Sequence, residues 1–181
     1  VRLDHLREMV QKRASRARHI RSLTEKDSLT GLLNHVRIKE ELFSEVSRAE
    51  RDNTDLAFVM LDIDLFKGVN DTHGHLVGDQ VIQGLARLLR DRFRLSDSVG
   101  RYGGEEFAVV MPGCSAGDAT LIFDELRVQF GKIRFRSDKG AFQSTFSAGI
   151  ATFEQGMHAE RLNDLADQAL YKAKHLGRNR L

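Results

Sequence analysis

This 181-residue sequence has almost no cysteine and no long apolar run. Its one cysteine, Cys114, excludes an internal disulfide and is compatible with a reducing compartment. No apolar stretch approaches the ~20 residues that a membrane-spanning helix needs. The first residue is Val, and no signal-peptide pattern follows it. We therefore expect a cytoplasmic segment of a longer protein, whether or not that parent protein is anchored in a membrane.

The sequence also lacks a strong net charge, since 28 Lys and Arg face 26 Asp and Glu. Residues 1–26 hold eight of the basic and three of the acidic residues, which leaves 20 against 23 on residues 27–181. A nucleic-acid-binding domain needs a basic face on the folded domain, so this balance argues against nucleic acid as a partner. The hydrophobic content of 41% suffices for the core of one ordinary domain.

Residues 1–26 contain neither glycine nor proline. Their apolar residues follow alternating three- and four-residue steps, interrupted by Arg13, at Leu3, Leu6, Val10, Ala17 and Ile20. This weak heptad pattern predicts a helical stalk that pairs with a second copy and follows an upstream sensor module. A solvated helix lying on its own domain is the alternative.

The segment 101–107, RYGGEEF, predicts the tip of a β-hairpin, because strand-like apolar residues lie on both sides of its paired glycines. Gly103 and Gly104 would allow positive φ and the close approach of a ligand. The adjacent Glu105 and Glu106 repel each other unless a cation lies beside them. A surface hairpin with solvated glutamates is the alternative from these residues alone.

A second acidic group follows an unbroken apolar run at residues 56–61, which predicts a buried strand. Strand alternation places Asp62 and Asp64 on one face and Ile63 on the other. Buried carboxylates are costly unless they are compensated, and Mg²⁺ binds one or two carboxylates together with substrate phosphate oxygens. The pattern favours a metal site, with acids that cap the next helix as the alternative.

Polar residues then flank a predicted amphipathic helix that ends near Phe93. Lys67 lies five residues beyond Asp62, close enough to meet the same phosphates. The carboxylate of Asp79 can accept both N–H groups of a guanine edge, and Asn70 can donate and accept. Helix capping or turn formation is the alternative role for both residues.

Five motifs in this order closely resemble the GGDEF family of diguanylate cyclases. They are DxLTGLxN from residue 27, DIDxFKxVND from residue 62, GHxxGD from residue 74, RYGGEEF from residue 101 and ALYxAKxxGRN from residue 169. The resemblance covers roughly residues 27–181, and the ordered set is far more specific than any one motif.

The resemblance implies an α/β (α+β) fold, with a ferredoxin-like antiparallel sheet akin to nucleotide cyclase and polymerase palm domains. The domain would span residues 27–181 behind a stalk of residues 1–26. The element order read from the residues agrees. After the hairpin we expect a helix at 116–130, strands at 132–136 and 142–153, and a last helix at 160–176.

The implied reaction condenses two GTP into cyclic di-GMP and two pyrophosphates, in a homodimer with one GTP per domain. Asp62, the Ile63 carbonyl and Glu105 would bind Mg²⁺, or Mn²⁺ in its place, and Glu106 would join a second ion. Glu105 is the implied proton acceptor. Lys67 would stabilise charge on the α-phosphate during attack.

The resemblance also implies binding sites for substrate and product. The substrate-binding positions are Phe66, Asn70, His75, Asp79, Gly103, Gly104, Lys174 and Arg178. Lys174 and Arg178 would reach phosphate from the last helix, one turn apart. Arg94 and Asp97 form an RxxD pattern at the spacing of the family's inhibitory product site, where cyclic di-GMP would act as feedback ligand. Arg127 is a candidate second arginine there.

Two positions depart from the family pattern, and two alternative functions fit it less well. His35 stands where the family usually has Arg, and Leu65 stands where an aromatic residue is common. A silent GGDEF domain that acts as a GTP or cyclic di-GMP receptor generally loses a metal acid or a hairpin glycine, and this chain keeps both. A cyclase acting on one nucleotide is disfavoured, because Asn70 and Asp79 match the guanine pattern of the two-GTP enzymes.

Overall fold

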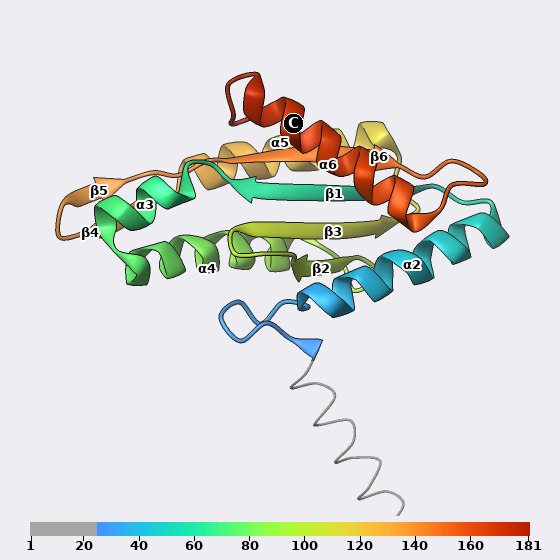
Figure 1. Ribbon diagram of the computed structural model, residues 1–181, viewed down its shortest axis with the longest axis horizontal. Coiled ribbons are helices and arrows are strands. Elements are labelled where there is room, and N and C mark those ends of the chain that lie inside the picture. The colour runs from blue at the N-terminus through green and yellow to red at the C-terminus, as the bar shows by residue number, and fades with distance from the viewer. Residues whose placement is uncertain (1–24) are drawn as a thin grey trace, which may run out of the picture.

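The structure is a computed structural model that describes residues 25–181, so the predicted heptad pattern from Leu3 to Ile20 lies outside the described residues. An antiparallel sheet of four strands forms its centre, as expected from the sequence (Figure 1). The strand order is β2 (Ser98–Arg101), β3 (Glu106–Pro112), β1 (Leu56–Ile63) and β6 (Phe146–Thr152). Within residues 25–181, no helix is both long and apolar enough to span a membrane.

Two pairs of helices cover the two faces of this sheet (Figure 1). One face packs against α4 (His75–Arg92) and α5 (Ala116–Gly131), and the other against α2 (His35–Asp52) and α6 (Ala159–His175). Because β1 is apolar at every position before Asp62, its alternating side chains enter both cores.

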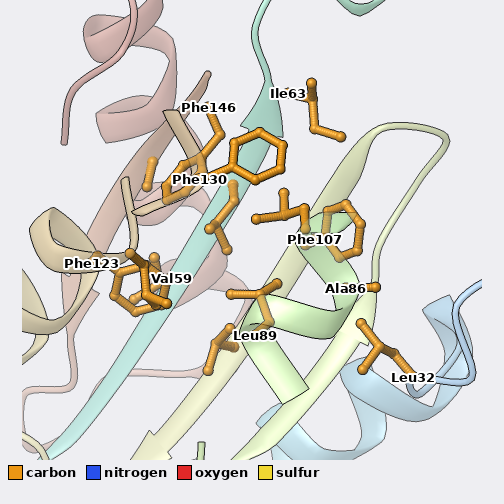
Figure 2. Close-up of a cluster of buried hydrophobic side chains, with 14 of the residues drawn as sticks. Leu32, Val59, Ile63, Ala86, Leu89, Phe107, Phe123, Phe130 and Phe146 are labelled. Atoms are coloured by element: carbon orange, nitrogen blue, oxygen red, sulfur yellow. The ribbon is translucent and has the colours of Figure 1, made fainter. Parts of the chain in front are cut away.

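The two cores differ in composition. The core beneath α4 and α5 is rich in phenylalanine, and Figure 2 shows Phe107, Phe123, Phe130 and Phe146 gathered around β1. The core beneath α2 and α6 contains Phe58 and Met60 of β1 with mainly aliphatic residues from the helices. Each fully buried large apolar side chain contributes roughly 1.5–3 kcal/mol, so β1 is fixed from both sides.

Two regions differ from the sequence prediction. Residues 66–73, for which the sequence predicted no helix or strand, form the short helix α3 (Phe66–His73). Two strands were expected at 132–136 and 142–153, but the structure has three shorter ones. β4 (Phe135–Ser137) and β5 (Gly140–Phe142) form a separate two-stranded sheet, and β6 follows in the main sheet. His73 holds this small sheet against α3, because its ring stacks on Phe142 at 3.9 Å and its Nδ1 lies 2.8 Å from Ser137 Oγ.

The sheet brings the predicted acidic motifs together at one end of its strands. Asp62 lies opposite Glu106 of β3 and opposite Ser147 of β6. The N–H of Ile63 donates to the carbonyl of Glu105 at 3.2 Å. The ends of β1 and of the β2–β3 hairpin therefore form one continuous surface.

Candidate functional site

An acidic cluster, formed by buried Asp62 and half-buried Glu105 and Glu106, lies at the end of β1. Asp62 is buried, and its Oδ2 lies 2.7 Å from Nζ of Lys174 on α6. Burial raises the pKa of Asp62 above its ordinary value, Lys174 opposes that shift, and the charges of Glu105 and Glu106 add to it. The structure therefore joins the acids of two motifs with one lysine of the closing motif.

The hairpin tip is tightly folded. The backbone N–H groups of Tyr102 and Gly103 both donate to the Glu106 carbonyl, at 2.8 and 3.2 Å. A Cβ added to Gly103 would lie 2.4 Å from Oε2 of Glu106, whereas one added to Gly104 would meet nothing within 4 Å. Neither glycine has a left-handed backbone, so the positive φ that glycine allows is not used at this turn. Gly103 makes room for the Glu106 carboxylate, and Gly104 leaves open space where a ligand can approach.

The opening motif braces this hairpin. The guanidinium of Arg101 donates to the Gly104 carbonyl from Nε and Nη2, at 3.0 and 2.8 Å, and pairs with Oδ2 of Asp27 at 3.1 Å. Burial alone would raise the pKa of Asp27, but hydrogen bonds from Thr30 and the Arg101 guanidinium hold that pKa below its ordinary value. Asp27 and Arg101 belong to two of the sequence motifs, but those motifs predicted no role for either residue.

His35 supports the same hairpin from α2. Its Nδ1 lies 2.5 Å from the Tyr102 carbonyl, and the two rings meet edge to face at 4.7 Å. The hydroxyl of Tyr102 also donates to Asn163 on α6, at 3.1 Å. The departure at position 35 therefore leaves a supporting contact with the hairpin in place.

The end of α3 and the start of α4 form a second polar corner. The Oδ1 of Asn70 is buried without a hydrogen-bond partner, a state shared in residues 25–181 only by Ser144 Oγ. A Cβ on Gly78 would lie 1.9 Å from this oxygen, so Asn70 sits directly beside the residue that precedes Asp79. Buried acceptors are almost always satisfied, so this unpaired oxygen marks the corner as a candidate binding site. Phe66 packs at the same corner.

The remaining predicted site residues lie around these two clusters. Lys67 and His75 are exposed on α3 and α4. Asp64 is buried and accepts hydrogen bonds from Thr145 and Ser147 and from the backbone N–H of Asn179. It therefore has structural partners of its own beside the acidic cluster.

Arg178 does not lie on the last helix, so the prediction that it follows Lys174 by one helical turn is wrong. α6 ends at His175, and Gly177, Arg178 and Asn179 have φ values of 115°, 59° and 48°. Gly177 ends the helix because it tolerates the left-handed backbone. Arg178 instead lies in a C-terminal loop that folds back toward β6.

The predicted RxxD pair forms a compact turn. The N–H of Arg94 donates to Oδ2 of Asp97 at 3.0 Å, and both residues line a cavity of about 580 Å³ together with Arg37 and Arg90. Arg127 is not at this cavity. It pairs with Asp124 at 2.8 Å and donates to Asn179, so this cavity gives no support to its suggested role as the second arginine.

Residues 25–181 contain no group of three or more His, Cys, Asp or Glu side chains placed to hold a metal ion by themselves. Mg²⁺ is commonly held by one or two carboxylates plus substrate phosphates rather than by an all-protein cage. The oxygen donors of Asp62 and Glu105, in a cluster of like charge, fit that arrangement. They suit a divalent cation that is bound jointly with a polyphosphate.

Comparison with known proteins places the chain in a family. The family model described as "Diguanylate cyclase, GGDEF domain" matches residues 24–180. Diguanylate cyclase DgcP of Pseudomonas aeruginosa is 43% identical over 155 residues, which are 86% of this chain and 23% of DgcP. This chain thus spans about a quarter of that relative's length.

Solved structures agree with the family model. The GGDEF domain of DgcB from Caulobacter crescentus, in complex with c-di-GMP, has a TM-score of 0.84 and 36% identity, covering 87% of this chain and 91% of that one. A longer DgcB structure with coiled coil and GGDEF domain has a TM-score of 0.91 and 32% identity, covering 99% and 95%. The chain belongs to the GGDEF family of diguanylate cyclase domains.

Proposed function

We propose that this chain is a Mg²⁺-dependent diguanylate cyclase, which condenses two GTP into cyclic di-GMP and two pyrophosphates. The observation that carries the proposal is the meeting of both acidic motifs. Asp62 faces Glu106 across the β1–β3 ladder, and burial raises the pKa of Asp62, with the charges of Glu105 and Glu106 adding to the shift. A silent receptor would not need this costly cluster of buried and neighbouring carboxylates.

The corner of α3 and α4 would bind the guanine base. The unpartnered Oδ1 of Asn70 would accept a hydrogen bond from the base, and the Asp79 carboxylate would accept from guanine N1–H and N2–H. Phe66 and His75 would border the base. Adenine presents the opposite pattern of donors and acceptors, so it would leave these groups unpaired and bind far more weakly.

The opposite side of the site would hold the triphosphate. Lys67 and Arg178 are exposed cations, while Lys174 is paired with Asp62. We infer that Lys174 exchanges this carboxylate for phosphate oxygens when nucleotide binds.

Asp62, the Ile63 carbonyl and Glu105 would then hold Mg²⁺ or Mn²⁺, and Glu106 would hold a second ion. A bound ion neutralises phosphate charge and lowers the pKa of the ribose 3′-OH. Glu105 would accept the hydroxyl proton, and the open backbone of Gly103 and Gly104 would let the nucleotide approach.

Turnover would require a homodimer, because one domain holds one GTP and each α-phosphate must meet the ribose of the other nucleotide. The predicted stalk of residues 1–26 would bring two domains together below a sensor module in the cytoplasm. The DgcB relative that includes a coiled coil covers nearly the whole chain, which supports this domain order. A short stalk interrupted by Arg13 would pair weakly without the upstream module.

Product analysis tests the proposal directly. The protein is incubated with GTP and Mg²⁺, and the nucleotides are separated by chromatography. We expect one cyclic di-GMP and two pyrophosphates from each pair of GTP, and no cyclic dinucleotide from ATP. Nucleotide binding without turnover would instead identify a silent receptor, and a 3′,5′-cyclic mononucleotide would identify a one-nucleotide cyclase.

A dilution series tests the dimer. Specific activity should rise with protein concentration until dimers dominate, because association follows mass action. Light scattering on the same samples gives the mass. A monomer with constant specific activity across the series would contradict the two-domain mechanism.

A further inference from the structure

The C-terminal loop, residues 176–180, has an unusual backbone. Gly177, Arg178 and Asn179 follow one another with positive φ, and two of the three carry side chains. Such a run persists only where its surroundings determine it. The N–H of Arg178 donates to the Ala173 carbonyl at 3.1 Å, so the loop also closes the last turn of α6.

Three contacts hold this loop to the domain. The Asn179 N–H donates to Oδ2 of Asp64 at 3.0 Å, and the Ala148 N–H of β6 donates to the Arg180 carbonyl at 2.9 Å. Arg127 donates to Oδ1 and to the carbonyl of Asn179, at 3.0 and 3.2 Å. Of the two side chains that anchor the loop, Asp64 is the buried one, at 5% exposure.

Asp64 links the loop to the centre of the site. Its carboxylate accepts from Thr145 Oγ1 and Ser147 Oγ, each at 2.7 Å, and its own N–H donates to the Thr145 carbonyl at 2.9 Å. It lies two residues beyond Asp62 and directly before Leu65, whose left-handed backbone begins α3. The Asp64 carboxylate thus joins the end of β1 to the start of β6 and to the loop.

We propose that Asp64 is a positioning residue, which fixes the C-terminal loop so that Lys174 and Arg178 stand where the triphosphate must lie. The inference rests on the proposed function for the identity of the ligand. Lys174 is on the last turn of α6, which the loop closes, and Arg178 is within the loop. The base corner is built by α3 and α4 instead. Loss of the Asp64 carboxylate should therefore weaken binding of the phosphates and leave binding of the base intact.

Binding and hydrogen exchange together test this role. Calorimetry compares guanosine with the α,β-methylene analogue of GTP, whose bridging carbon blocks turnover. For Asp64→Ala we expect the dissociation constant of the analogue to rise about 10-fold, the low end of the cost of losing a supporting partner. The constant for guanosine should change less than about 2-fold. Amide exchange in the peptide 172–181 should accelerate about 10-fold, because the Asn179 N–H loses its acceptor.

Two matched variants separate positioning from general stability. Asp64→Asn keeps one oxygen for the donors of Thr145 and Asn179, and its amide can donate to Ser147, so it should restore both measurements toward the parent. Ser147→Ala removes a donor to the same carboxylate without touching the loop contact, and should leave exchange at Asn179 unchanged.

The outcomes distinguish this inference from the proposed function. A parent protein that binds neither ligand contradicts the proposed function, while the exchange measurement still tests the loop. Equal weakening of guanosine and the analogue, or unchanged exchange in Asp64→Ala, overturns the positioning role. If circular dichroism shows that Asp64→Ala is unfolded, a chain truncated after Arg178 serves instead, because it lacks the loop contacts of Asn179 and Arg180. The truncated chain must bind the analogue more weakly than the parent while binding guanosine equally well. Equal affinities for the analogue in the truncated chain and the parent overturn the inference.

Discussion

The base side and the phosphate side of the site satisfy their polar groups in opposite ways. At the base corner, Asn70 Oδ1 is buried without a partner, and Gly78 leaves just enough room for it. On the phosphate side, Lys174 is already paired with Asp62, and Asp64 accepts three hydrogen bonds. The base corner therefore holds an acceptor without a partner, whereas on the phosphate side Lys174 and Asp64 already have partners within the protein.

This difference separates recognition from chemistry. A base that enters a preformed corner orders little, so its hydrogen bonds appear mainly as affinity and specificity. On the phosphate side, a contact with Lys174 must replace its pair with Asp62, which reduces the contribution of that contact to ground-state binding. Contacts that gain strength only as charge builds on the phosphate raise the rate instead. Variants on the two sides should therefore change different kinetic parameters.

The largest effect is expected from the acidic cluster. Asp62→Ala and Glu105→Ala should each lower kcat by on the order of 10²–10³ or more, because a preorganised charge at the reacting centre is lost. Asp62 is a buried acid with a raised pKa, so its removal should leave the melting temperature unchanged or higher. Initial rates and thermal melts measure both quantities. Near-parent activity in either variant would remove the proposed metal site.

On the base side, Asp79→Ala should weaken GTP binding. The guanine donors lose a charged acceptor, which is worth about 1.5–3 kcal/mol, or roughly 10–150-fold in affinity. Calorimetry with the α,β-methylene analogue measures the loss, and guanosine should show the same factor. Unchanged affinity would move base recognition to another part of the chain.

Gly78 gives a sharper test of the same corner. A methyl group there would lie 1.9 Å from Asn70 Oδ1, so Gly78→Ala should displace Asn70 and weaken guanosine binding by about 10-fold, the cost of one misplaced hydrogen bond. Gly68→Ala is the matched control on α3, because its Cβ would meet nothing within 4 Å. If both variants bind guanosine like the parent, Asn70 is not the acceptor.

Local sequence patterns explain which parts of the fold could be predicted. The unbroken apolar run of β1 and the glycine pair of the hairpin are local patterns, so both strands and the acids at their ends were placed correctly. α3 was missed because FKGVNDTH contains a glycine and few apolar residues in helical spacing. Arg178 was placed on the helix because its spacing from Lys174 fits one turn, but Gly177 ends the helix before it.

Contacts between segments far apart in the chain could not be predicted from the sequence. Asp27 and Arg101 lie 74 positions apart, and Asp64 meets Asn179 across 115. Only the folded arrangement of the strands brings such pairs together. The contact of Arg127 with Asn179 could not be foreseen for the same reason, because 52 positions separate the two residues.

Feedback by product should depend on the cavity at Arg94 and Asp97, away from both sides of the catalytic site. Arg94→Ala should still make cyclic di-GMP, but its progress curves should not flatten as product accumulates, because a phosphate-binding cation is lost. Arg51→Ala, an exposed arginine outside this cavity that pairs with Asp52, is the matched control and should keep the feedback of the parent. Curves that flatten equally in the parent and in Arg94→Ala would place inhibition elsewhere.

The smallest effect is expected from the brace between the opening motif and the hairpin. Asp27→Asn removes the charge that pairs with Arg101, which in turn holds the Gly104 carbonyl. For this partly buried pair we expect a loss of about 1 kcal/mol in the free energy of unfolding at pH 7. That loss corresponds to a fall of about 2–4 °C in melting temperature for a domain of this size.

The pH dependence identifies the carboxylate as the cause. The folded-state pKa of Asp27 lies below the ordinary value of 3.8, so the unfolded chain binds the proton more readily. The stability contributed by Asp27 is therefore complete above about pH 4 and is lost as pH falls through the folded-state pKa. Urea unfolding of the parent and of Asp27→Asn should differ at pH 7 and converge as the pH falls below the folded-state pKa of Asp27. Asp52→Asn, in an exposed pair with Arg51, should show almost no difference at either pH. A gap between the parent and Asp27→Asn that persists unchanged at low pH would assign the brace to the shape of the side chain rather than to its charge.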